Sequence, residues 1–284
     1  MSDAFDNKQQ ACRLRIYEYD SIVYQIDADM PEDKLLWDSG WVETDKQRMK
    51  YTGKPLPEGQ MLVVGVQIRD VFGNESRIAK DFFVNGLTDM SCASWITHPV
   101  AQKRVPICLR KDIELQEQPV DACLYVAGIG YHEVLLNGER IDEAHLDPAH
   151  TNYKKQVQYA VITNWDFAQS FTVGKNALAV QVADGWRCND TTFFTGMFAG
   201  RPIEFFGEPM LIAKLVLKFA DGSTQTIVTD DSWLCGHDAI TDVSIFDGET
   251  YDARLHDPHW MLPGGGKDFV QVVIKPSPTE SLCP

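Results

Sequence analysis

The chain has 284 residues, enough for about two domains, and its 44% hydrophobic and 24% charged content is ordinary for a globular protein. The net charge of −15 argues against a nucleic-acid partner, because phosphate binding needs a basic face. The apolar runs are strand-sized, so no membrane span is expected. The N-terminus shows no leader pattern, and seven scattered cysteines show no CxxC spacing. We therefore expect a cytoplasmic protein with reduced thiols rather than a disulfide framework or a zinc site.

Residues 11–88 are predicted to form a small β-sandwich of the immunoglobulin or fibronectin type. Short strands are expected at 24–26 and 62–71, separated by turn signals at 38–40, 53–55 and 57–59. In the second strand the period of two puts Leu62, Val64, Val66 and Ile68 on one face, which we expect to be the buried one.

After a linker at 86–94, residues 94–256 are predicted to form a longer β-domain. Asn137-Gly138 predicts a hairpin, and Leu178, Val180 and Val182 alternate along a strand at 177–185. A second hairpin at 210–230 turns at Asp221-Gly222, with Leu211, Ala213, Leu215, Leu217 and Phe219 on one face. Only residues 164–171 suggest a helical turn, and 257–284 read as a wrapping tail or linker rich in Pro and Gly. The fold class is therefore all-β, with two sandwiches.

Four polar loop segments flank these strands, at 146–153, 183–190, 205–210 and 245–254. In a sandwich such loops collect at the two ends. A sugar site needs an aromatic face for the apolar side of the ring and planar polar side chains for the hydroxyls. The loops supply these types with Asn152, Tyr153, Asp184, Trp186 and Arg187. The alternative is that Asp184-Gly185-Trp186 is only a tight turn with a packed tryptophan.

Other chemistry is weakly indicated. Asp147, Asn152 and Asp184 carry oxygens that calcium accepts, but no EF-hand spacing is present. His145 and His150 are read as solvated loop histidines. Glycosidase chemistry needs two carboxylates held about 5–10 Å apart, which sequence spacing cannot show. The isolated candidates for such a role are Glu204, Glu208 and Glu249.

Several segments together resemble a known family. YVAGIGYHEVLLNGERIDEAHLDPAHTNYKKQVQYA, NALAVQVADGWRCND and TDDSWLCGHDAITDVSIFDGETYDAR are similar to the N-terminal region of bacterial α-L-rhamnosidases, glycoside hydrolase family 78. LLWDSGWVETD, YTGKPLPEG and VQIRDVFGNES resemble the fibronectin-type domain that opens many of these enzymes. The resemblance runs in order through roughly residues 20–260.

The resemblance implies a fibronectin type III-like domain followed by a galactose-binding-like jelly roll. In some members this jelly roll is a calcium-dependent rhamnose-binding module. The resemblance carries over only Asn152 and the carbonyl of Pro209; with the loop residues, the sugar-binding candidates are Asn152, Tyr153, Asp184, Trp186, Arg187 and Glu208. The metal candidates are Asp147, Asn152 and the carbonyl of Pro209. The stretch 150–153 stands where many relatives have a Trp-Thr-Asp-Tyr-like sequence, so an amide replaces an acidic ligand.

The family places its catalytic carboxylates in a later (α/α) barrel, and this sequence has no long amphipathic helices. The expected role is thus a non-catalytic accessory region, inactive alone, with L-rhamnose or rhamnose-containing glycans and the catalytic barrel of the full-length enzyme as partners. One alternative is a purely structural region that packs on the barrel and binds no sugar. Another is an independent hydrolase that uses carboxylates within the sandwiches.

Overall fold

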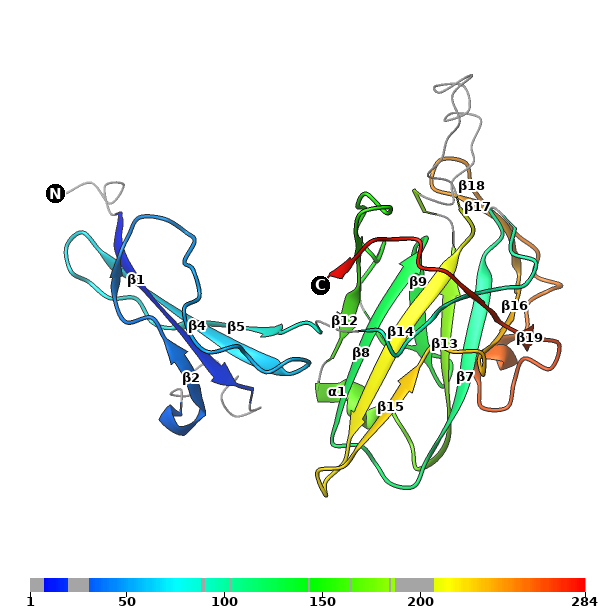
Figure 1. The fold of residues 1–284 in the computed structure, drawn as a ribbon, viewed down its shortest axis with the longest axis horizontal. Coiled ribbons are helices and arrows are strands. Elements are labelled where there is room, and N and C mark those ends of the chain that lie inside the picture. The colour runs from blue at the N-terminus through cyan, green and yellow to red at the C-terminus, as the bar shows by residue number, and fades with distance from the viewer. Residues whose placement is uncertain are drawn as a thin grey trace. The chain divides into compact units, whose positions relative to one another are not determined.

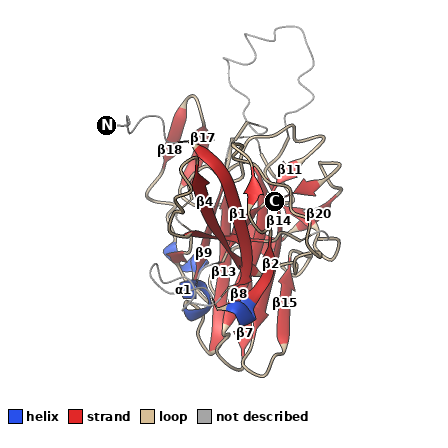
Figure 2. Cartoon of the chain, turned by 90° about the vertical axis from the view of Figure 1, so that its left-hand side faces the viewer, coloured by secondary structure: helices blue, strands red, loops and turns tan. Residues whose placement is uncertain are grey.

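The structure is a computed structural model that describes residues 8–19, 31–87, 90–102, 104–142, 144–163, 165–183, 185–186 and 207–283. The chain divides into two compact units, Met1–Thr88 and Asp89–Pro284. Strands dominate both units, and the described helices are short (Figures 1 and 2). None of these helices is both long and apolar enough to cross a membrane. The strand expected at 24–26 lies outside the described residues.

The first unit contains a five-stranded antiparallel sheet in the order β2-β1-β4-β5, with β3 also pairing with β1. Its elements are β1 (Gln9–Glu18), the 3-10 helix η1 (Glu32–Lys34), β2 (Leu35–Asp38), β3 (Val42–Glu43), β4 (Met61–Asp70) and β5 (Ala79–Val84). Of the predicted inward face of β4, Leu62 is fully buried but Ile68 is 41% exposed, whereas Val63 on the opposite face is fully buried, so the prediction is wrong for this strand. Both faces are apolar at the start of β4, and alternation alone does not tell which of them meets Tyr17 in the small core.

The second unit is built on two six-stranded sheets. One has the order β12-β8-β14-β6-β20, with β15 pairing with β14. Its strands are β6 (Trp95–Thr97), β8 (Asp121–Ile129), β12 (Ala160–Ile162), β14 (Met210–Lys218), β15 (Thr224–Val228) and β20 (Val273–Lys275). The other has the order β10-β9-β13-β7-β16-β19. Its strands are β7 (Ile107–Leu115), β9 (His132–Leu136), β10 (Glu139–Arg140), β13 (Gly174–Val182), β16 (Leu234–Gly236) and β19 (Val270–Gln271).

Side chains from both sheets form a single hydrophobic core. The predicted alternation along β13 and β14 is confirmed, because all the residues predicted to share one face belong to this core: Leu178, Val180, Val182, Leu211, Ala213, Leu215, Leu217 and Phe219. Both predicted hairpins are also present. Asn137 and Gly138 have φ of 54° and 89°, as a type I′ turn requires, and Gly222 has φ of 85°. The predicted helical turn is α1 (Trp165–Gln169).

The C-terminal segment covers outer surfaces of the sandwich, and Figure 1 shows it in red crossing the β8–β14 sheet. It includes the 3-10 helix η2 (Pro258–Met261) and β21 (Leu282–Cys283), which pairs in parallel with β11 (Val157–Gln158). Trp260 on η2 is 3% exposed and packs on Cys108 and Ala179, on the outer face of the β7–β13 pair. The buried Arg110 donates to the Trp260 carbonyl at 3.1 Å. Residues 257–284 thus complete the domain by covering apolar side chains that face away from the core.

Six cysteines within the described ranges are free, and four of them are buried. Burial raises the pKa of the Cys123 and Cys235 thiols to about 12, which keeps both protonated at neutral pH. These thiols therefore act as small apolar groups in the packing.

Candidate functional site

One end of the second unit brings together loops that follow β13, precede β11 and join β17 (Ile240–Ser244) to β18 (Gly248–Tyr251). Trp186 is positioned by a close backbone approach. Ala183 donates its N–H to the Tyr131 carbonyl at 2.8 Å. A Cβ on Gly130, whose φ is 106°, would lie 2.0 Å from the Ala183 carbonyl oxygen, so only glycine fits there. Gly130 thus permits the close approach of the two backbones that leads into the loop of Trp186.

The loop that carries His150 and Tyr153 is held by backbone hydrogen bonds. The Asp147 carbonyl accepts from the His132 N–H at 2.8 Å, and the Asn152 carbonyl accepts from Lys155 and Gln156. Tyr153 is 5% exposed, so its ring anchors the loop from within. His150 is exposed and meets this ring edge to face, with 5.7 Å between the ring centroids of His150 and Tyr153.

The β17–β18 hairpin brings Phe246 to the same place. The Ser244 hydroxyl accepts from the Phe246 N–H at 3.2 Å, which shapes the turn. Arg104 fixes the base of the hairpin by pairing with Asp242 at 2.6 Å and with Asp247 at 2.7 Å. The hydrogen bond from Arg104 lowers the pKa of the Asp242 carboxyl, so this clamp stays ionised at neutral pH.

The four rings form what we call the loop-end aromatic cluster: His150, Tyr153, Trp186 and Phe246. The centroid of Trp186 lies 5.2 Å from His150 and 5.6 Å from Phe246, the latter in an edge-to-face arrangement. Trp186 is half-buried and Phe246 is 45% exposed. An exposed aromatic surface rimmed by polar loops offers a face for the apolar side of a sugar ring.

Tyr153 and Trp186 are in the cluster, and of the other four predicted sugar residues the structure describes only Asn152 and Glu208. Asn152 is exposed beside the buried Tyr153, within reach of solvent. Glu208 forms an ion pair with Lys275 at 2.8 Å, so its charge is already compensated. Asp184 and Arg187 lie outside the described residues, as does the isolated carboxylate candidate Glu204. Glu249 is exposed on β18.

The metal candidates were tested against the geometry. The Pro209 carbonyl accepts a hydrogen bond from the Thr97 hydroxyl at 2.6 Å. Burial raises the pKa of the Asp147 carboxyl, which makes it a poorer anion than an ordinary aspartate. Within the described ranges no group of three His, Cys, Asp or Glu residues is placed to hold a metal ion. The described part of the proposed ligand set does not by itself make a calcium site.

Sequence reasoning missed two members of the cluster. His150 was read as a solvated histidine, and it is exposed, but its ring bridges Tyr153 and Trp186. Phe246 lies in the segment predicted as a polar loop at 245–254, where the apolar pair Ile245-Phe246 next to the turn residues Asp247-Gly248 is the signal that could have found it. Only the hairpin geometry brings that ring to Trp186.

The fold and the cluster define an all-β, two-unit chain with an aromatic loop end on its second unit. Comparison with known proteins gives the family. Residues 117–284 match the α-L-rhamnosidase N-terminal domain, and residues 1–89 match the Rha78A-like N-terminal immunoglobulin domain. The chain belongs to this family: it is an immunoglobulin-like domain followed by the β-domain of an α-L-rhamnosidase N-terminal region.

Individual relatives point to the same family. A protein named α-L-rhamnosidase from Formosa agariphila is 30% identical over 248 residues, which cover 81% of this chain and 26% of that protein. The solved α-L-rhamnosidase from Dictyoglumus thermophilum has a TM-score of 0.76 at 26% identity, covering 98% of this chain and 31% of that one. The Streptomyces avermitilis α-L-rhamnosidase solved with L-rhamnose has a TM-score of 0.68 at 17% identity, covering 96% and 42%. At that identity it shows the fold alone. The chain thus spans about a quarter of the length of the curated relative from Formosa agariphila.

Proposed function

We propose that this chain is a carbohydrate-recognising accessory region and that its loop-end aromatic cluster binds L-rhamnose or the terminal rhamnose of a glycan. The observation that carries the proposal is the pairing of Trp186 with Phe246, whose rings meet edge to face at 5.6 Å on loops from distant parts of the chain. In such an edge-to-face pair, the apolar face of a sugar can stack on one ring while the edge of the sugar contacts the other ring. The exposed amide of Asn152 and the imidazole of His150 would hydrogen-bond hydroxyls.

The choice of rhamnose rests on the relatives, which are named α-L-rhamnosidases. A 6-deoxy sugar presents a methyl group as well as ring C–H groups, and this chemistry suits an aromatic corner. The reaction itself is assigned to a catalytic barrel in the full-length enzyme, so this region would hold or orient rhamnose-capped glycans near that barrel.

We propose calcium as an accessory ligand of this region. Asn152 and Asp147 could each supply one oxygen. Any site would need further oxygen ligands, since calcium takes about 6–8. A chelator arm in the binding experiment separates metal-dependent from metal-independent recognition.

The test is calorimetric titration of the chain with L-rhamnose, with calcium and with chelator. We expect saturable binding that weakens about tenfold, or about 1.4 kcal/mol, in Phe246→Ala. Phe72→Ala is the matched control, because Phe72 is 64% exposed on a turn of the first unit. Equal weakening in both variants, or no binding of L-rhamnose by the parent chain, would refute the assignment.

A scaffold role is the second candidate, and exposed apolar side chains in the first unit favour it. Phe72, Phe82 and Ile68 are 64%, 43% and 41% exposed, which suits an interface with another part of a larger enzyme. Under this function the region binds no sugar but stabilises a separately expressed catalytic barrel. The measurement is the barrel's melting temperature with and without this chain.

A further inference from the structure

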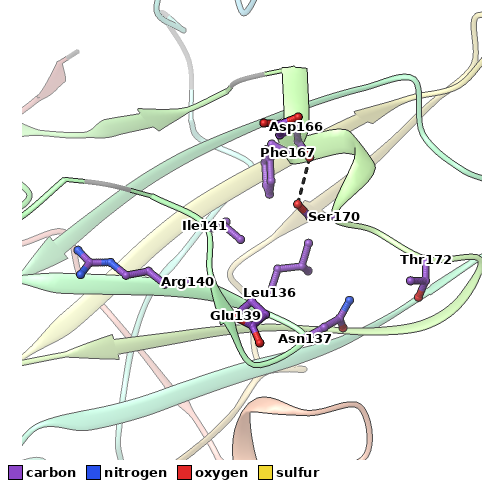
Figure 3. A pocket seen from close by; sticks show the side chains of 9 residues that line it. All are labelled: Leu136, Asn137, Glu139, Arg140, Ile141, Asp166, Phe167, Ser170 and Thr172. Atoms are coloured by element: carbon purple, nitrogen blue, oxygen red, sulfur yellow. Dashed lines mark hydrogen bonds between the residues drawn. The ribbon is translucent and has the colours of Figure 1, made fainter.

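A cavity lies at the other end of the second unit from the aromatic cluster, between α1 and the β9–β10 hairpin (Figure 3). Its volume is about 460 Å³. The register of β9 and β13 shows that the cavity and the cluster lie at opposite ends of this strand pair. Leu136, beside the cavity, pairs with Leu178, whereas His132, at the loop end, pairs with Val182. β9 and β13 therefore separate this cavity from the loop-end aromatic cluster along their length.

The floor of the cavity is apolar. Leu136 and Phe167 belong to the main hydrophobic core and are only 2% and 1% exposed, so they reach the pocket by their edges, and the half-buried Ile141 packs against that core. Figure 3 shows Leu136 in the middle of the pocket, with Phe167 and Ile141 around it. A ligand resting here needs an aliphatic portion.

The neutral polar side chains at the rim already donate within the fold. The Asn137 amide donates to Asn176 at 2.9 Å and the Ser170 hydroxyl to the Asp166 carbonyl at 3.0 Å. The Thr172 hydroxyl donates to the Asn176 side chain at 3.3 Å. A carbohydrate, whose hydroxyls need both donors and acceptors, finds few donors in this pocket.

The free groups at the rim are acceptors. Asp166 on α1 and Glu139 on the hairpin lie on opposite sides of the pocket in Figure 3, and both residues are exposed. Neither carboxylate has a hydrogen bond or ion pair with another described residue. Arg140 also lines the pocket, but its guanidinium lies 3.3 Å from both Glu133 and Asp142 and donates to the Ala144 carbonyl.

We propose that this cavity binds an amphipathic cation, an amine or guanidinium on a short aliphatic chain, by seating the chain on Leu136, Ile141 and Phe167 and the charge on Asp166 and Glu139. Ammonium and guanidinium groups only donate hydrogen bonds, so they match a rim of free acceptors. The net charge of −15 attracts such ligands to the whole surface, and the apolar floor is what distinguishes this place. The inference is independent of sugar binding at the loop end.

The experiment is an NMR titration of the ¹⁵N-labelled chain with 1,5-diaminopentane, and with pentane-1,5-diol as a neutral molecule of similar shape. We expect the diamine to shift the amides of residues 137–141 and 166–172 saturably, whereas the diol shifts them little. High salt should weaken the diamine because the carboxylates are exposed. The double variant Glu139→Gln, Asp166→Asn should weaken it about tenfold.

The control double variant is Asp45→Asn, Glu249→Gln, which removes the same two charges at exposed positions that do not line the cavity. Equal weakening in both double variants would overturn the proposal, since it would mean attraction to the net charge alone. Equal affinity for the diol would overturn the cation assignment. Shifts of the same amides by L-rhamnose in place of the diamine would make the cavity a carbohydrate site and overturn it as well.

Discussion

Acidification should destabilise the second unit through one buried histidine. His132 begins β9 on the same face as Val134 and Leu136, which belong to the core, and it is 4% exposed. Both ring nitrogens are buried, and within the described residues neither has a hydrogen-bond partner. Burial therefore disfavours the charged form and lowers the pKa of His132 to about 4.

The sign of the effect follows from proton binding. Between pH 6.5 and 4 the unfolded chain protonates this imidazole and the folded chain does not, so stability falls as the pH falls. Above pH 6.5 both states are neutral and the penalty is absent. A lowering from 6.5 to about 4 corresponds to about 3 kcal/mol over the whole window, of which about 2 kcal/mol is lost by pH 5.

The assay is urea unfolding followed by tryptophan fluorescence at pH 7 and pH 5, for the parent chain and for His132→Leu. The variant should lose about 2 kcal/mol less than the parent between the two pH values, whatever its stability at pH 7. His145→Gln, at an exposed loop position, controls for the loss of a histidine as such. An identical pH dependence in His132→Leu and the parent, or a His132 ring that titrates near pH 6.5 by NMR, would refute the reasoning.

Three further predictions follow from the packing. Trp260→Ala should lower the free energy of unfolding by about 3–5 kcal/mol in urea melts, because the ring is buried on the outer face of the β7–β13 pair; a change below 1 kcal/mol would contradict this. Cys92 is exposed and should react with a maleimide in the native protein, whereas Cys123 should react only on unfolding, and fast labelling of Cys123 would count against its burial. Arg104→Ala should raise the pKa of Asp242 toward its ordinary value in an NMR titration, and an unchanged pKa would show that the ion pair is not formed in solution.

The local sequence pattern was sufficient to predict several strands and hairpins of the second unit. In the segment 211–219 every second residue, from Leu211 through Ala213, Leu215 and Leu217 to Phe219, is apolar, and the structure places all five in one core. Asn137-Gly138 and Asp221-Gly222 predicted their hairpins because the low cost of a positive φ depends on the residue type alone and not on distant contacts. The family resemblance added the order of the two domains, which the family comparison bears out.

The sequence by itself therefore determined the all-β class, the strands at 177–185 and 210–230 and the hairpin turns of the second unit, since these depend on neighbours along the chain. Tertiary structure alone decided which face of β4 is buried, how the C-terminal segment carries Trp260 onto the outer face of a sheet, and which rings meet Trp186. His150, Trp186 and Phe246 are far apart in sequence, and no local periodicity relates them. Their contact depends on the strand pairings and close backbone approaches that bring three loops to one end, and such contacts are set by packing over the whole domain.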